Sequence, residues 1–383
     1  MMYIKERKDT MNKKDYSNTI DLQIKELDKL VDVQLEKCFG KEKRENILSV
    51  EDAAKIKRVI LSGCGDSFSA AGAMAEAFRK ISGVKALHTP DPMEFTRYYT
   101  DFDLTKGNKK EETLVVAISA SGGGVRIAEI LDRGEGCHTM LITNNPQSDN
   151  CKHAKSTFWV ETPEGCNSPG LRSYFASMIA LIALASHIGK ANSHIDEAYE
   201  NKLIEDIRNY VHEFMKDFEK IDDLMFSEAI RMKDFKKFDI VADGCDWYSA
   251  QFVEQKFIEC SGVQATHTNS EEWVHISMMT KGPENIGTIF MIIKDSPSYR
   301  RIVDTSWGSL RLERPTLIVT DADKKDFEDE AVFLNIPSAP QIYLAPLMDF
   351  IPGSLIAGYH AAINERWFFQ NRYDFRKQEW HRD

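Results

Sequence analysis

The sequence lacks the cysteine spacings that build zinc sites, redox dithiols or disulfide frameworks. Seven cysteines occur in 383 residues, and no Cys-x-x-Cys pair is among them. An odd number of cysteines without paired spacing is typical of reduced thiols in a cytosol. We therefore expect a cytoplasmic protein that holds no metal, and the sequence suggests no resident cofactor.

Long apolar runs and an excess of positive charge are also missing. No run of 18 apolar residues occurs, and the first residues are charged, so we expect neither a membrane span nor a signal peptide. The most apolar stretch, Tyr174–His187, contains two serines and is predicted to be a buried helix. The net charge of −11 argues against binding to nucleic acid or to a membrane surface.

The sequence does contain a regular alternation of apolar strands and helical segments. Continuous apolar runs, such as Val59–Leu61 and Thr113–Ser119, predict buried strands that are each followed by a helix. This alternation predicts an α/β fold with parallel sheets and right-handed crossovers. A chain of 383 residues with 42% hydrophobic content is long enough for two domains.

The second half of the chain repeats the first at an offset of about 180 residues. Residues 60–70, ILSGCGDSFSA, align with residues 240–250, IVADGCDWYSA, and a Ser-Gly-Val triplet recurs at 82–84 and 261–263. We interpret the chain as two copies of one α/β unit. The predicted organisation is an N-terminal helical segment (1–50), a first domain (51–191), a helical connector (192–233), a second domain (234–365) and a C-terminal tail (366–383).

Two turns in the first copy are suited to binding an anion. One strand runs into Gly63-Cys64-Gly65-Asp66-Ser67, and another runs into Ser119-Ala120-Ser121-Gly122-Gly123-Gly124, each before a helix. Turns of this kind present backbone N–H groups to an anion at a helix start. A well-capped helix start and a flexible loop are the plainer alternatives for the two turns.

The corresponding turns of the second copy have different residues. Trp247 stands where the first copy has Ser67, and Lys294-Asp295-Ser296-Pro297-Ser298 replaces the glycine-rich run. Proline has no N–H to offer, and Asp295 would repel an anion. We therefore predict an anion site in the first copy only.

With these turns and the duplicated layout, the chain resembles the sugar-isomerase (SIS) domain family over residues 30–365. The architectures it resembles most are the fructosamine-6-phosphate deglycases and the isomerase half of glucosamine-6-phosphate synthase. The resemblance implies two tandem SIS-type three-layer α/β/α domains with parallel, flavodoxin-like sheets. It also implies a sugar-phosphate site formed by Gly65, Asp66, Ser67, Ser119, Ser121, Gly122, Gly124 and Ser168. Family members often have Glu and Thr where this chain has Gly123 and Gly124, so one hydroxyl contact is lost.

The stretch from Glu254 to His275 resembles the catalytic segment of the family. There, a glutamate moves a proton between C1 and C2, and a histidine sixteen residues later opens the sugar ring or shuttles a proton. Glu259 and His275 have this spacing, although Ile276-Ser277 follows where the family often has Gly-Pro. The alternatives are Glu254, Glu271 and Glu272 for the base and His267 for the histidine, while Lys256 and Arg172 are substrate contacts or surface residues.

The chemistry requires these residue types independently of the resemblance. Proton transfer between C1 and C2 needs a carboxylate close to the carbon acid, and ring opening needs a group that titrates near neutrality. By resemblance we expect a deglycase that cleaves a fructosamine-type sugar 6-phosphate into a hexose 6-phosphate and an amine. The alternatives are an amino-sugar-phosphate isomerase or deaminase without a glutaminase domain, and a non-catalytic phosphosugar sensor. The resemblance also implies a homodimer whose site is shared across subunits.

Overall fold

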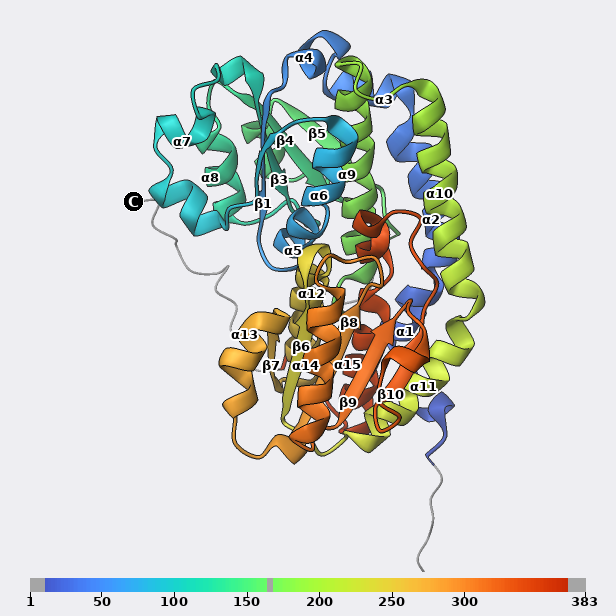
Figure 1. Ribbon diagram of the computed structural model, residues 1–383. Helices are drawn as coiled ribbons and strands as arrows, with labels where there is room; N and C mark the ends of the chain where they lie inside the picture. The colour runs from blue at the N-terminus through green and yellow to red at the C-terminus, as the bar shows by residue number, and fades with distance from the viewer. Residues whose placement is uncertain (1–10, 164–167, 371–383) are drawn as a thin grey trace, which may run out of the picture.

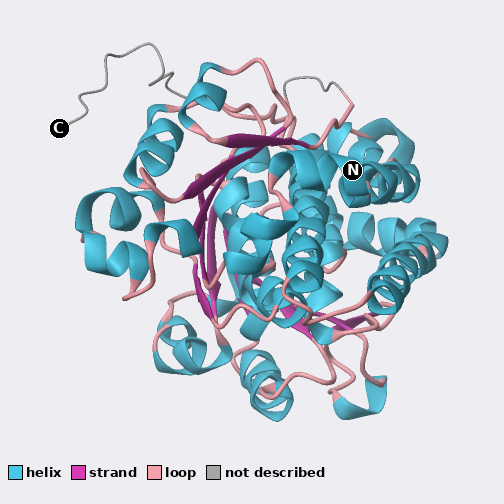
Figure 2. Ribbon diagram, turned by 90° about the horizontal axis from the view of Figure 1, so that it is seen from above, coloured by secondary structure: helices cyan, strands magenta, loops and turns pink. Residues whose placement is uncertain are grey.

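The computed structural model describes residues 11–163 and 168–370, which form two parallel β-sheets surrounded by helices (Figures 1 and 2). The first sheet has the strand order β2-β1-β3-β4-β5, and the second has the order β10-β9-β8-β6-β7. When the strands are numbered within their own half, both sheets have the order 2-1-3-4-5, which is that of flavodoxin-like folds. The predicted fold class, two tandem α/β units with parallel sheets, is confirmed.

The first half contains five strands and the helices that connect them. Its strands are β1 (Arg58–Gly63), β2 (Ala86–His88), β3 (Thr113–Ile118), β4 (His138–Thr143) and β5 (Ser156–Trp159). Its longer helices are α5 (Asp66–Ala73), α6 (Ala75–Ser82), α8 (Val125–Arg133) and α9 (Leu171–Ala191). Shorter turns of helix are α7 (Asp101–Thr105), the π-helix η2 (Glu94–Tyr98), η3 (Lys110–Glu112) and η4 (Asp149–His153).

The second half repeats this layout. Its strands are β6 (Lys237–Ala242), β7 (Gln264–Thr268), β8 (Ile286–Ile292), β9 (Thr316–Thr320) and β10 (Val332–Asn335). Its helices are α12 (Trp247–Ser261), α13 (Ser270–His275), α14 (Tyr299–Arg311) and α15 (Phe350–Ile363). Single helical turns are η5 (Gly244–Asp246), η6 (Ser277–Met279), η7 (Pro283–Asn285), η8 (Lys324–Asp326) and η9 (Ile342–Leu347).

The remaining helices run along one side of both halves (Figure 1). They are η1 (Lys13–Tyr16), α1 (Thr19–Lys25), α2 (Leu27–Phe39), α3 (Lys41–Ile47) and α4 (Val50–Lys55), with the connecting helices α10 (Glu197–Lys216) and α11 (Phe218–Arg231). Helix α1 packs on both α9 and α15, the long apolar helices of the two halves. The N-terminal segment therefore ties the two halves together.

Two segments are long and apolar enough to cross a membrane by length and composition. They are Leu171–Ala191 and Ile342–Ile363, yet 89% and 94% of their most apolar windows are buried inside the protein. Both segments serve here as core helices beneath their sheets. The second is interrupted, because η9 contains Pro346 and ends before α15 begins.

Helices α5 and α12, the first helices after the first strand of each half, pack against each other at the centre of the molecule (Figure 1). A Cβ on Gly72 would lie 2.2 Å from the ring of Tyr248, so glycine is required for this close approach. Across the same contact, the Ser69 hydroxyl donates to Gln251 at 3.0 Å. This packing brings the far end of α12 to the turn that follows β1.

Candidate active site

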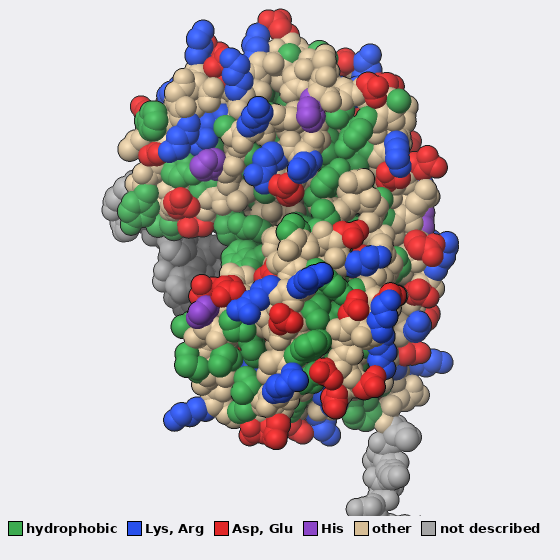
Figure 3. Space-filling view, in the orientation of Figure 1, with side chains coloured by type: hydrophobic (Ala, Val, Ile, Leu, Met, Phe, Trp, Pro, Cys, Tyr) green, Lys and Arg blue, Asp and Glu red, His purple; other side chains and the backbone are tan. Residues whose placement is uncertain are grey.

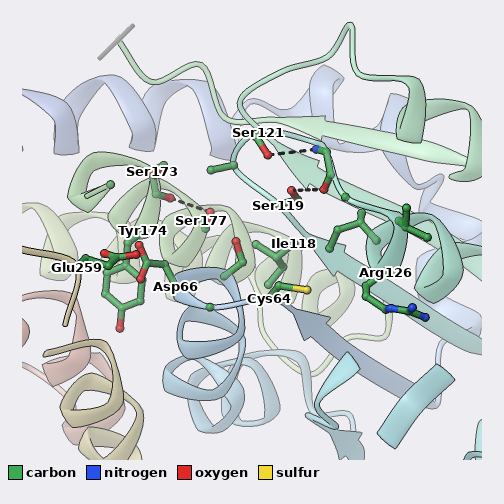
Figure 4. A pocket seen from close by; sticks show the side chains of 18 of the residues that line it. Cys64, Asp66, Ile118, Ser119, Ser121, Arg126, Ser173, Tyr174, Ser177 and Glu259 are labelled. Atoms are coloured by element: carbon green, nitrogen blue, oxygen red, sulfur yellow. Dashed lines mark hydrogen bonds between the residues drawn. The ribbon is translucent and has the colours of Figure 1, made fainter. Parts of the chain in front are cut away.

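A cavity of about 680 Å³ opens at the carboxyl ends of β1 and β3, where the first sheet meets α12 (Figure 4). This is the edge at which open parallel sheets bind their ligands. Seven of the residues predicted from the sequence line it: Gly65, Asp66, Ser67, Ser119, Ser121, Gly124 and Glu259. The two turns of the first half and the glutamate of the second half thus meet in one place.

Two helices begin at the cavity wall without a side-chain cap. Helix α5 starts after Gly65, which has φ +57°, and α8 starts after Gly124, which has φ +100°, and in neither case does a side chain accept from the first N–H groups. Both glycines adopt backbone angles that other residues rarely tolerate. Uncapped helix starts carry unsatisfied N–H donors and a partial positive charge, so this part of the cavity favours an anion.

The loop after β3 is held in shape by its own hydrogen bonds. The Gly122 N–H donates to the Ser119 carbonyl at 2.9 Å, and the Ser119 hydroxyl donates to the Gly123 carbonyl at 3.3 Å. The Gly123 N–H in turn donates to the Ser121 hydroxyl at 3.2 Å (Figure 4). The loop is therefore an ordered turn that presents hydroxyl groups, and not the flexible loop that was the plainer alternative.

Helix α9 supplies the opposite wall of the cavity. Ser173, Tyr174 and Ser177 line it, and the Ser177 hydroxyl donates to the Ser173 carbonyl at 2.8 Å. The Tyr174 ring stacks on Phe252 of α12 with the ring centroids 3.8 Å apart. Cys64 also lines the cavity, and its surroundings raise the pKa of the thiol by desolvation, so the turn does not activate it.

Lys256 bridges the two halves beneath the cavity. Its Nζ donates to both carboxylate oxygens of Asp66 at 2.9 and 2.7 Å, and also to Glu259 Oε2 one turn along α12. The Lys256 side chain is fully buried, which opposes its charge, but Asp66 and Glu259 raise its pKa overall. The lysine is thus a buried cation that is shared by one carboxylate from each half.

Three predicted site residues do not line the cavity. His275 ends α13 on the surface, with 65% of its side chain exposed, and bonds Glu271 at 3.0 Å. Ser168 accepts a hydrogen bond from the Gln23 side chain at 3.1 Å. Gly122 is buried within the loop that it shapes, and residues 164–167 of the predicted Ser168 loop lie outside the described residues.

The alternative bases and the alternative histidine also lie away from the cavity. Glu254 bonds His267, whose ring packs on Trp247 with the centroids 4.4 Å apart. Glu271 and Glu272 are exposed on α13. Of the four carboxylates considered for the base, Glu259 is therefore the one that reaches the cavity.

Sequence reasoning left two residues of this site unassigned. From the sequence, Lys256 is either a substrate contact or a surface residue, whereas the structure shows it as a buried bridge between Asp66 and Glu259. The signal that could have found this role is its position three residues before Glu259 on a predicted helix, which places the two side chains on the same face. Arg126, in the first turn of α8, lines the cavity and was not considered. Among the described residues, no group of three or more His, Cys, Asp or Glu is placed to hold a metal ion.

Comparison with known proteins supports the fold. No protein-family profile and no curated protein sequence matches the chain. Among solved structures, it is similar to the C-terminal domain of glucosamine-fructose-6-phosphate aminotransferase from Francisella tularensis, with a TM-score of 0.77 and 18% identity over 92% of this chain and 98% of that one.

Two further solved structures share this fold at lower identity. Tagatose-6-phosphate ketose/aldose isomerase from Escherichia coli matches with a TM-score of 0.69 and 12% identity, over 91% of this chain and 93% of that chain. Glucosamine-6-phosphate deaminase from Thermotoga maritima matches with a TM-score of 0.60 and 12% identity, over 88% of this chain and 96% of that chain. The chain therefore has the double-SIS fold along nearly its whole length.

Proposed function

We propose that the chain is an enzyme that binds a sugar phosphate in this cavity and moves a proton between C1 and C2 of the sugar. One observation carries the proposal: the hydroxyls of Ser119 and Ser121 and the uncapped start of α8 lie on one side of the cavity, and Glu259 lies on the other beside Asp66 (Figure 4). Three proteins of the same fold, each named for a sugar 6-phosphate, support this class of substrate.

The phosphate would bind between the two turns of the first half. The hydroxyls of Ser67, Ser119 and Ser121 hold it together with the N–H groups at the starts of α5 and α8. This grip is remote from the reacting carbons, so its binding energy orients C1 and C2 toward Glu259. Lys256 acts as a positioning residue, because it donates to the carboxylate of Glu259 and so fixes its position.

For the reaction we propose deglycation of a fructosamine-type 6-phosphate. The Glu259 carboxylate removes a proton from C1 of the open-chain substrate and returns it at C2, while the amine N–H proton passes to the C2 oxygen, so the ketosamine becomes an imine at C1 with a hydroxyl at C2. Water then adds to C1 and the amine leaves with a proton, so the products are a hexose 6-phosphate and a free amine. Without an amine on C1, the same proton transfer interconverts a ketose phosphate and an aldose phosphate.

We also propose that the active protein is a homodimer and that His275 acts in the site of its partner. His275 is exposed and lies outside the cavity of its own chain. Next to it, Ile276 and Met279 expose 64% and 65% of their surface to solvent. An exposed apolar pair beside a titratable side chain fits a surface that is covered by another subunit.

A non-catalytic phosphosugar sensor is the second candidate. The observation that favours it is that no imidazole lines the cavity among the described residues. A sensor needs the phosphate grip but no proton transfer. DNA binding is not proposed for it, because the chain carries a net charge of −11 and its surface mixes both signs of charge over the face shown in Figure 3.

The test is proton exchange at the sugar. The protein is incubated in D₂O with a fructosamine 6-phosphate, fructose 6-phosphate or glucosamine 6-phosphate, and NMR follows deuterium entering C1 or C2 together with free amine and hexose 6-phosphate. We expect exchange by the wild type and its loss in Glu259→Gln. Binding of these ligands without any exchange would favour the sensor, and exchange that persists in Glu259→Gln would overturn the assignment of the base.

A further inference from the structure

The charges around the cavity are unevenly distributed. Among the described residues that line it, Asp66 and Glu259 are carboxylates and Arg126 is the one cation. Lys256 is committed to both carboxylates and is fully buried. Among the described residues that line the cavity, Arg126 is therefore the one available for direct charge pairing with a doubly charged phosphate.

The space beside Arg126 is open. Gly123 and Gly124 both line the cavity, so this part of the wall carries no side chains. A Cβ built on Gly124 would meet no atom nearer than 3.9 Å, and one built on Gly123 would meet none nearer than 3.5 Å. Arg126 follows two residues after Gly124 in the first turn of α8, and this opening gives its long side chain room to turn.

Arg126 and Arg97 both pair with the same carboxylate, Glu129. The Arg126 guanidinium bonds Glu129 one turn along α8, and Figure 4 shows the side chain directed away from the serine hydroxyls. Arg97 of η2 also pairs with Glu129, with its Nη2 at 3.2 Å from both carboxylate oxygens. Because Glu129 has two arginine partners, it stays paired when Arg126 leaves.

We propose that Arg126 recognises the charge of the ligand phosphate. Its guanidinium breaks its contact with Glu129 and binds the phosphate, while Arg97 stays paired with Glu129. The identity of the ligand in this proposal rests on the proposed sugar-phosphate function. A guanidinium offers two parallel N–H donors to a phosphate, which gives stronger bonds than the neutral hydroxyls of Ser119 and Ser121 can make. The site is thereby specific for phosphomonoesters over uncharged sugars.

The test measures the affinity of the full chain for inorganic phosphate and for glucose 6-phosphate by calorimetry. We expect Arg126→Gln to weaken both about tenfold to a hundredfold, and Arg126→Lys to weaken them less. Glu129→Gln removes the carboxylate that competes for Arg126, so we expect affinity to rise about twofold to fivefold. If the Arg126–Glu129 ion pair had only a structural role, the two substitutions would not change phosphate affinity in opposite directions.

Arg133→Gln is the matched control, because Arg133 lies on the same helix but pairs with Asp101 at 3.2 Å and does not line the cavity. We expect it to change affinity less than about twofold, since the charge it removes is screened by salt. Melting temperatures confirm that each variant is folded.

Three results would overturn the proposal: wild type that binds no phosphate, Arg126→Gln that binds as tightly as wild type, or Glu129→Gln that weakens binding as Arg126→Gln does. These outcomes are separable from the enzymatic proposal. Arg126-dependent phosphate binding without proton exchange on any sugar phosphate supports the role of Arg126 and contradicts the proposed enzyme. Glu259-dependent exchange that is indifferent to Arg126 does the reverse.

Discussion

The two halves of the chain share a strand order but differ where their central strands end. After β1, the first half has small residues, Gly65 and Ser67, and an open cavity. After β6, Trp247 replaces Ser67 and its ring packs on His267, and Asp246, the counterpart of the cavity residue Asp66, is only 2% exposed. Duplication thus produced one open, anion-receptive edge and one edge closed by carboxyl and aromatic side chains.

The halves also differ in the charges on their paired helices. On α12, Lys256 and Glu259 form an ion pair that faces the cavity of the first half. At the same offset of 180 residues, α6 carries Glu76 and Arg79, a pair whose side chains are 36% and 48% exposed. One pair is built into the contact between the halves and the other lies in solvent. The second half therefore contributes the Glu259 carboxylate to the cavity of the first half.

The largest expected effect comes from breaking this contribution at Glu259. Glu259→Gln keeps the size of the side chain but cannot accept the proton, so we expect the rate of proton transfer to fall about 10²-fold to 10⁴-fold. Binding of the sugar phosphate should remain within about threefold, since the phosphate grip is elsewhere. Glu254→Gln, on the same helix but bonded to His267, is the control, and an equal loss there would contradict the comparison.

The second prediction concerns stability. Lys256→Met leaves Asp66 and Glu259 facing each other without their shared cation, and we expect the free energy of unfolding to fall by about 2–4 kcal/mol. Arg79→Met removes the exposed counterpart, for which about 0.5 kcal/mol or less is expected. Urea unfolding of both variants measures the difference. Equal losses of unfolding free energy in the two variants would mean that the buried Lys256 bridge stabilises the protein no more than the exposed ion pair does.

A third prediction uses pH to probe the closed edge of the second half. Burial raises the pKa of Asp246 to about 7, and burial raises the pKa of the neighbouring Asp349 well above its usual value. A raised pKa means that the folded state holds the proton more tightly. The contribution of Asp246 is therefore complete below about pH 4 and is lost as pH rises to about 7, at up to about 1.4 kcal/mol per pH unit.

We expect Asp246→Asn to remove the part of this pH dependence that comes from Asp246, with the part from Asp349 remaining, and to be more stable than wild type at pH 8. Chemical unfolding between pH 4 and 8 measures it. Asp295→Asn, which makes the same charge change at an exposed position of the same half, should leave the slope unchanged. A slope that is the same in wild type and Asp246→Asn would show that the closed edge is not the source.

The proposed dimer gives a fourth prediction. If His275 completes the partner's site, the Glu259→Gln and His275→Ala variants are each inactive alone. A mixed dimer of the two has one working site, which combines Glu259 of the His275→Ala subunit with His275 of the Glu259→Gln subunit. Random exchange of subunits should then recover about a quarter of wild-type activity. No recovery from a mixture shown to exchange subunits would place His275 outside the reaction or in the site of its own chain.

The smallest effect is expected from matched serines in the two loops. Ser121 and Ser296 lie in the corresponding loops after β3 and β8, but of the two only Ser121 lines the cavity. We expect Ser121→Ala to weaken sugar-phosphate binding about threefold to tenfold, the usual worth of one hydrogen bond. Ser296→Ala should stay within about twofold. Calorimetric titration of both variants compares them.

Much of the fold could be predicted because its signals are local or repeated. The Ser-Gly-Val triplets of the repeat prove to be helix ends, with Gly83 and Gly262 both in the left-handed conformation at φ +73° and +65°. Apolar runs such as Thr113–Ile118 are strands buried on both faces. Within the predicted N-terminal helical segment, the apolar residues of Ile20–Phe39 recur at helical spacing throughout, yet the structure has two helices divided at Glu26, a break that this spacing does not show.

The site was predictable only in part, because its assembly depends on contacts distant in sequence. The turn residues Gly65 and Ser67 have local signals, and they do line the cavity. The bridge from Lys256 to Asp66 spans 190 residues and depends on the packing of α12 on α5. Which face of α8 Arg126 occupies is likewise decided by how that helix packs on its sheet. No spacing rule in a single sequence encodes these placements.

The most direct test of the central claim is a crystal structure of the protein with fructose 6-phosphate. The account predicts the phosphate between Ser67, Ser119 and Ser121 at the starts of α5 and α8, with C1 and C2 beside the carboxylate of Glu259. Phosphate density at the corresponding edge of the second half, or a sugar whose C1 and C2 lie away from Glu259, would contradict it.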